Sequence, residues 1–136
     1  LPALIRKIHE AKINCIDSVE IWGTGEPRRE FLHVNDISDA CIHFFENVDA
    51  NKLYDEMKLS HINIGSGNDI KIKDLAKMIS ELIGYDGKLR YNTEIPDGTP
   101  RKLLDVSRVN SLGWKSMIPL DEGIKSTYEW FLNEFI

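Results

Sequence analysis

The stretch Ile21–Asp36, IWGTGEPRREFLHVND, places two apolar runs on either side of a turn that contains two glycines and a proline. The residues that lead up to Gly23, VEIW, have the β-branched and aromatic composition of a strand, and EFLHV predicts a second short strand. Asn35 or Asp36 then caps a helix. The stretch therefore predicts short strands that alternate with helices.

The same alternation continues on both sides of this stretch. Apolar residues at helical spacing predict helices from Leu1 to about Asn14, from Ile72 to a stop at Gly84, and from about Leu120 onward. HINIG at 61–65 and KLRYN at 88–92 predict further strands. Strands separated by helices favour parallel pairing, so the predicted fold class is α/β, with helices and short strands in one domain.

The composition excludes several classes of function. The net charge of -5 is the wrong sign for holding nucleic acid. Cys15 and Cys41 are the only cysteines, and neither has metal-ligand spacing to a histidine, so we expect no metal site and a reducing, cytoplasmic setting. No apolar stretch is long enough to predict a membrane span.

Arg28 and Arg29 stand side by side immediately after the turn. Adjacent cations repel, so the pair indicates two separate surface contacts or an anion that at least one of them binds. Side chains alternate along a strand, and the two guanidinium groups should leave the backbone in opposite directions. We expect Arg29 to face a ligand and Arg28 to reach solvent or Glu26.

Two other features are open to more than one interpretation. Trp22 ends a strand before a glycine turn, where its ring can stack on a base or close the core. The segment PDGTPRKLLDVSR at 96–108 gathers Asp97, Arg101 and Lys102 around prolines. This loop can bind phosphate and sugar hydroxyls, or it can be a solvated loop of salt bridges.

The chain also contains two Gly-x-Gly pairs, at 23–25 and at 65–67, and neither completes the dinucleotide fingerprint G-x-G-x-x-G. We therefore expect no cofactor site within these residues.

Taken together, LPALIRKIHEAK, WGTGEPRREFLHVND, HINIGSG, PDGTPRKLLDVSR, LGW and LDEGIKSTYEWF resemble, in order, the C-terminal portion of the GDP-L-fucose synthase family. That family consists of extended short-chain dehydrogenases/reductases, within the NAD-dependent epimerases/dehydratases. The resemblance implies that residues 1–136 form a C-terminal substrate-binding domain, and that the N-terminal NADP-binding Rossmann domain is missing from this chain. REFLHV is shared across the superfamily, whereas PDGTPRKLLD is more specific to the fucose synthases.

The resemblance also implies roles for five residues. Arg29 would contact the diphosphate of a GDP-sugar, with Trp22 lying along the nucleotide. Lys7 would supply a cation from the first helix, Lys102 would contact phosphate, and Asp97 would contact the sugar or the ribose.

The activity implied for the intact enzyme is conversion of GDP-4-dehydro-6-deoxy-D-mannose to GDP-L-fucose with NADPH, in a cytoplasmic homodimer. The family's catalytic residues would lie upstream of Leu1, so none is assigned here and the segment alone is expected to be inactive. Two alternatives stay open. The chain could be part of another nucleotide-sugar epimerase or dehydratase, or a non-catalytic module that binds a phosphorylated ligand or a protein.

Overall fold

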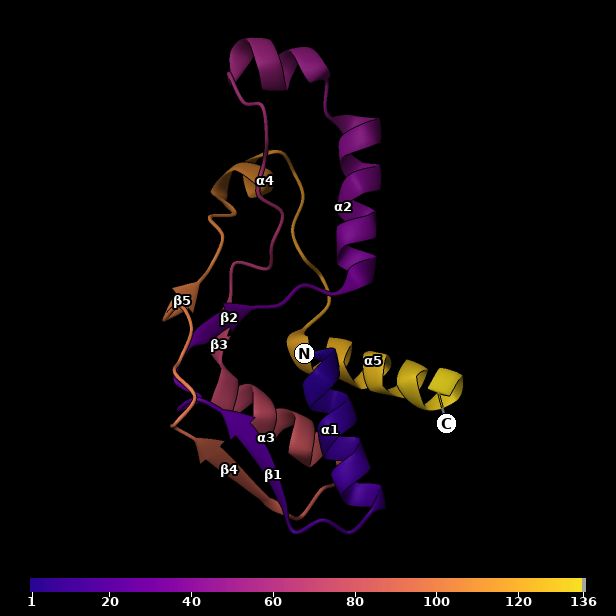
Figure 1. Cartoon of the computed structure of the whole chain (residues 1–136). Coiled ribbons are helices and arrows are strands. Elements are labelled where there is room, and N and C mark those ends of the chain that lie inside the picture. Colours follow the sequence, from indigo (N-terminus) through magenta and orange to yellow (C-terminus); the bar gives the residue numbers. More distant parts are fainter. Residues whose placement is uncertain (136) are drawn as a thin grey trace. The chain divides into compact units, whose positions relative to one another are not determined.

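The computed structural model describes residues 1–135 and has a mixed α/β fold, as predicted. Figure 1 shows its elements, whose order along the chain is α1 (Pro2–Ile13), β1 (Ser18–Trp22), β2 (Arg28–Glu30), α2 (Val34–Asn47), the π-helical segment η1 (Lys52–Glu56), β3 (Asp69–Lys71), α3 (Ile72–Ile83), β4 (Lys88–Asn92), β5 (Arg101–Lys102), α4 (Ser107–Ser111) and α5 (Leu120–Phe135).

The chain divides into two compact units. The first contains residues 1–29, residues 69–102 and the chain from Asp121 onward, and the second contains Glu30–Asn68 and Leu103–Leu120. No helix in residues 1–135 has the length and apolar character needed to cross a bilayer.

The first unit is built on the parallel pair β1–β4, which runs in register from Ser18 opposite Lys88 to Trp22 opposite Asn92. Helix α1 packs on β1 and on α3, and Figure 1 shows both helices beside the strands. Alternate residues of β1 are buried, as a half-covered strand requires. The core of this unit is aliphatic and includes Ile5, Ile8, Val19, Ile21, Leu75, Ile79 and Ile83.

The remaining strands form a sheet with the order β3–β2–β5, in which β2 and β5 are parallel. The strand pairs β1–β4 and β2–β5 are both parallel, which confirms the predicted parallel pairing. The loop Gly23–Pro27 links β1 to β2, and the loop Thr93–Pro100 links β4 to β5.

The second unit packs around Ala40, Val109 and Trp114, which are at most 3% exposed. The Trp114 indole Nε1 donates to Asp39 Oδ2 at 2.9 Å. Asp36 is buried and accepts hydrogen bonds from the backbone N–H groups of Met117 and Ile118. These polar contacts satisfy groups that would be costly to bury unpaired.

Three local predictions are wrong. The second strand covers Arg28–Glu30 instead of EFLHV, and residues 61–65 form no strand. A strand needs a partner to satisfy its backbone, and Ile62 and Ile64 instead pack side chains against the core of the second unit. The N-cap of α2 is His33, whose Nδ1 accepts from the Asn35 N–H at 3.2 Å, and Asp36 lies inside the helix.

Candidate phosphate-binding site

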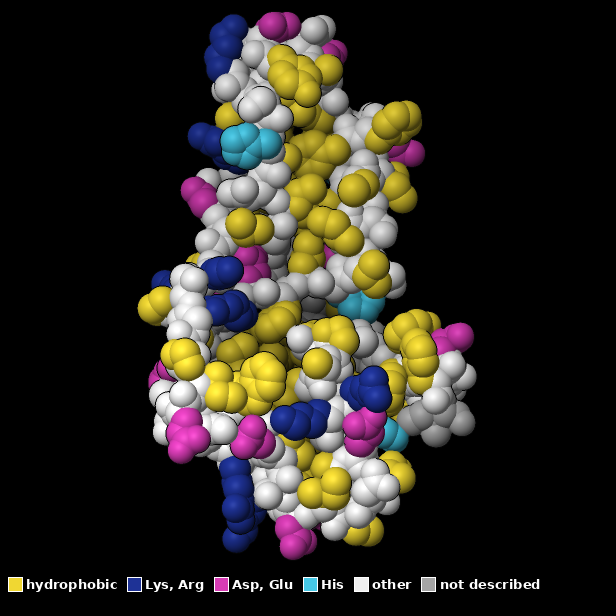
Figure 2. Space-filling model, in the orientation of Figure 1, with side chains coloured by type: hydrophobic (Ala, Val, Ile, Leu, Met, Phe, Trp, Pro, Cys, Tyr) yellow, Lys and Arg dark blue, Asp and Glu magenta, His cyan; other side chains and the backbone are white. Residues whose placement is uncertain are grey.

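Strands β2 and β5 bring four cations together. Their register places Arg28 opposite Arg101 and Arg29 opposite Lys102, so both cross-strand pairs consist of like charges. Like charges directly opposite each other destabilise a pair of strands unless an anion lies beside them. In the space-filling view, Lys and Arg side chains gather where Figure 1 places these strands (Figure 2).

Asp69, in β3, provides that anion for the first pair. The Arg28 Nε donates to Asp69 Oδ1 at 2.7 Å, its Nη2 donates to the Asp69 backbone oxygen at 3.0 Å, and the Arg101 Nε donates to Asp69 Oδ2. The Asp69 side chain is only 3% exposed. The hydrogen bond from Arg101, assisted by that from Arg28, lowers the pKa of Asp69.

Of the two surroundings predicted for Arg28, solvent or Glu26, the ion pair with Glu26 is wrong, while the Arg28 side chain is 38% exposed. Arg28 does not bind Glu26, whose carboxylate is bound by Lys71 at 2.8 Å and by Lys73. The hydrogen bonds from these lysines, first Lys71 and then Lys73, lower the pKa of Glu26 from 4.5 to about 2. Asp69 lies 41 residues from Arg28 along the chain, which is why the local sequence did not reveal it.

The second like-charge pair has no such counter-ion. Within residues 1–135, neither Arg29 nor Lys102 forms an ion pair with a carboxylate. The Arg29 Nη1 donates to the carbonyl oxygens of Arg28 and Thr99, each at 2.7 Å, so the guanidinium is held in place while its charge is not neutralised. Because neighbouring residues of a strand alternate, this pair belongs to the face opposite Asp69.

Trp22 and Asp97 meet the turn that follows β1. Trp22 is 68% exposed, so of its two interpretations the one in which it closes the core is wrong. Both Asp97 carboxylate oxygens accept from Thr24, Oδ1 from the backbone N–H at 2.9 Å and Oδ2 from the hydroxyl at 2.5 Å. Asp97 thus fastens the Thr93–Pro100 loop to the turn.

Gly23 is required at this junction. Its φ is +77°, and a Cβ there would lie 2.2 Å from Asp97 Oδ1. The turn after Trp22 is therefore specified by both its backbone angle and its close contact with the second loop.

Lys7 occupies a separate position. Its Nζ donates to the Glu20 carbonyl oxygen at 2.5 Å, two residues before Trp22. The five predicted site residues thus fall into three local arrangements within the first unit: Arg29 with Lys102, Trp22 with Asp97 at one turn, and Lys7 on the backbone of β1.

Asp69 was missing from the predicted site, and Arg101 was predicted as a member of the loop at 96–108 without a role of its own. The signal available in the sequence was the second adjacent pair of cations, Arg101–Lys102, which mirrors Arg28–Arg29. Once such strands pair in register, an acidic partner is required on at least one face.

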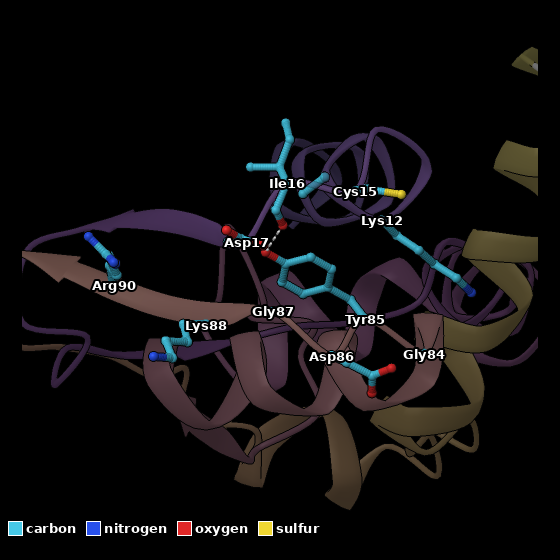
Figure 3. A pocket seen from close by; sticks show the side chains of 11 residues that line it. Lys12, Cys15, Ile16, Asp17, Gly84, Tyr85, Asp86, Gly87, Lys88 and Arg90 are labelled. Carbon is cyan, nitrogen blue, oxygen red and sulfur yellow. Dashed lines mark hydrogen bonds between the residues drawn. The ribbon is translucent and has the colours of Figure 1, made fainter.

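An open groove of about 680 Å³ lies elsewhere in the first unit, at the amino ends of β1 and β4 (Figure 3). Its charges are mixed, and two of its polar groups are already bonded: the Tyr85 hydroxyl donates to the Ile16 carbonyl oxygen at 2.8 Å, and the Lys12 Nζ donates to the Ile83 carbonyl oxygen at 2.5 Å. No group of His, Cys, Asp and Glu in residues 1–135 is arranged to hold a metal ion.

Comparison with known proteins identifies relatives over the whole chain. The model of the NAD dependent epimerase/dehydratase family matches residues 1–65. The chain is 46% identical over 132 residues to GDP-L-fucose synthase 1 of Arabidopsis thaliana, in an alignment that covers 97% of this chain and 38% of that protein. It is 47% identical over 133 residues to GDP-L-fucose synthase of Escherichia coli K12, covering 97% of this chain and 41% of that protein.

Among solved structures, a GDP-mannoheptose C4 reductase from Campylobacter jejuni with NADP bound superposes with a TM-score of 0.83 at 43% identity. The alignment covers 96% of this chain and 44% of that one. The chain thus spans about two fifths of the length of the relatives that it matches.

Proposed function

We propose that this chain is the GDP-sugar-binding portion of a GDP-L-fucose synthase of the NAD-dependent epimerase/dehydratase family. It is similar over almost its whole length to part of the GDP-L-fucose synthases, and the family model matches residues 1–65. The complete enzyme converts GDP-4-dehydro-6-deoxy-D-mannose to GDP-L-fucose. It inverts C3 and C5 of the sugar and reduces C4 with a hydride from NADPH.

The observation that carries the proposal is the like-charge pair of Arg29 and Lys102. Two cations in register, with no carboxylate partner in residues 1–135, leave an unneutralised positive charge on one face of β2–β5. A diphosphate supplies the missing counter-ion. Arg29 can hold two phosphate oxygens through its planar guanidinium, and Lys102 adds a point charge.

The other predicted residues receive roles that fit their surroundings. The exposed ring of Trp22 stacks along the guanine base. Asp97 keeps the turn beside Trp22 in shape and has acceptor capacity left for a sugar or ribose hydroxyl. Lys7 is an additional cation, with its ammonium already oriented by the Glu20 carbonyl oxygen.

Chemistry is assigned to the rest of the proposed enzyme. We assign no catalytic or metal-binding residue to this chain, and NADP is held mainly by an N-terminal domain in a cytoplasmic homodimer. Residues 1–136 act as its C-terminal substrate-binding domain and are inactive alone.

A GDP-sugar C4 reductase of different sugar specificity is the second candidate, because the Campylobacter jejuni reductase is 43% identical to this chain.

Calorimetric titration of this chain with GDP tests the proposal. We expect saturable binding, weaker by about ten- to a hundredfold in Arg29→Ala and in Lys102→Ala, since each removes a charge-assisted contact. Arg6→Ala is the matched control, because Arg6 is an exposed arginine of α1 that pairs with Glu10. Arg28→Ala is not a neutral control, since it would leave the Asp69 side chain, which is 3% exposed, with one partner fewer.

UDP and dTDP serve as competing ligands in the same titration. Preference for GDP supports the proposed enzyme class, whereas equal affinity for UDP or dTDP favours another nucleotide-sugar epimerase or dehydratase. Absence of GDP binding to folded wild-type chain, checked by circular dichroism, contradicts the proposal.

A further inference from the structure

We propose that Asp69 is a positioning residue of the ligand site: by bridging Arg28 and Arg101 with one carboxylate, it holds β2 and β5 in the register that places Arg29 and Lys102 together. This inference rests on the proposed binding of a GDP-sugar. Asp69 itself belongs to the face that the ligand does not occupy.

The short length of β5 is the first reason to expect such a device. The strand contains only Arg101 and Lys102, and register is weakly specified when a strand is short and exposed. The backbone contributes one further link at this junction, from the Arg28 N–H to the Pro100 carbonyl oxygen at 2.8 Å. A slip of one residue would turn Lys102 to the wrong face, because side chains alternate along a strand.

Charge gives a second reason. Without Asp69, Arg28 and Arg101 would oppose each other across the two strands with no anion between them, and their repulsion would push β5 away from β2. The carboxylate has one oxygen on each guanidinium, Oδ1 on Arg28 and Oδ2 on Arg101. It therefore joins all three strands of the β3–β2–β5 sheet through side chains.

Asp69 differs in this respect from the other doubly paired carboxylate of the unit. Glu26 also binds two cations, but both Lys71 and Lys73 lie in one continuous segment at the start of α3. The Glu26 side chain is 52% exposed, whereas the Asp69 side chain is 3% exposed. Glu26→Gln is thus a matched control that removes two ion pairs without touching the β2–β5 pair.

The test is a double-mutant cycle on the affinity of the chain for GDP. We expect Asp69→Asn to weaken binding by about five- to tenfold, and to have less than about a twofold effect in a chain that already carries Lys102→Ala. A purely structural loss would lower affinity equally in both backgrounds. The non-additivity is therefore the readout that general destabilisation does not produce.

Arg101→Gln keeps the experiment decisive if Asp69→Asn does not fold. The Arg101 side chain is 59% exposed, and its replacement removes one of the two ion pairs of Asp69 while the pair with Arg28 stays. We expect it to weaken GDP binding by about two- to fivefold, again only when Lys102 is present.

The outcomes separate the two proposals. If Lys102→Ala and Arg29→Ala leave GDP binding unchanged, the proposed function fails. If those variants weaken binding but Asp69→Asn and Arg101→Gln do so no more than Glu26→Gln, or do so additively, the ligand site stands and the positioning role of Asp69 is overturned.

Discussion

At the scale of single residues, Trp22 is the side chain that we propose to stack on the guanine base of the ligand. We expect Trp22→Ala to weaken GDP binding by roughly 1–3 kcal/mol, the usual worth of a base stacked on an aromatic ring. The free energy of unfolding should change by less than about 0.5 kcal/mol, because the ring is 68% exposed.

The matched control for this substitution is Trp130→Ala. Trp130 lies in α5 and is 55% exposed, so its replacement removes a similar ring from a surface with no proposed ligand. Isothermal titration and urea unfolding of both variants check the prediction. Equal GDP affinities for the two variants would contradict the stacking role.

The two arginines show how far residue-scale reasoning reaches. Alternation along the strand predicted different surroundings for Arg28 and Arg29, and the two side chains do have different partners. That Arg29 binds phosphate stays a prediction. The partner of Arg28 could not be found in the same way, because Asp69 comes from a different strand far along the chain. Side-chain direction is a local property, whereas the choice of an ion-pair partner depends on tertiary structure.

At the scale of elements, the helices with a strong apolar period were predictable and the isolated strands were not. Helix α3 ends as predicted at Gly84, whose φ is +70°, and the Tyr85 N–H donates to the Ser80 carbonyl oxygen at 3.0 Å. A helix satisfies most of its backbone internally, so its own sequence decides it. Residues 61–65 have an apolar pattern suited to a strand, but a strand requires an edge to pair with.

The start of α3 also makes a testable contribution to pH dependence. Glu26 ties the turn before β2 to Lys71 and Lys73, and its pKa is lowered to about 2. A lowered folded-state pKa means that these ion pairs stabilise the fold above pH 4.5, and that this stabilisation is lost as pH falls toward about 2. We expect the stability of Glu26→Gln to lack this part of the pH dependence.

Urea unfolding of the chain between pH 5 and pH 2 measures this effect. The free energy of unfolding of the wild type should fall more steeply than that of Glu26→Gln. Lys71→Met should give an intermediate slope, because Lys71 makes the larger contribution to the shift and Lys73 remains. Parallel slopes for the wild type and Glu26→Gln would show that the two lysines do not hold the carboxylate in solution.

At the scale of the whole molecule, the predicted site residues all belong to one of the two compact units. The resemblance predicted which residues belong to the site. Which of them lie together depends on pairing between segments more than 70 residues apart, such as Arg29 with Lys102. That long-range register could not be read from local sequence. The prediction that residues 1–136 act as one substrate-binding domain remains a prediction.

The elements that follow the two glycine turns predict which nucleotides this chain binds. In a dinucleotide-binding fold, the glycine turn leads directly into a helix whose amino end faces the pyrophosphate. Here Gly23 and Gly25 lead into β2, and Gly65 and Gly67 lead into β3. We therefore expect this chain to bind GDP but to have no specific site for NADPH.

Titration of the chain with NADPH, followed by the fluorescence of the reduced nicotinamide, tests this expectation. NADPH also carries a diphosphate, so weak binding through Arg29 and Lys102 should appear, and excess GDP should displace it. Arg29→Ala should abolish that weak signal, whereas Arg6→Ala should leave it unchanged. Saturable micromolar NADPH binding that GDP does not displace would mean that this chain has a cofactor site of its own.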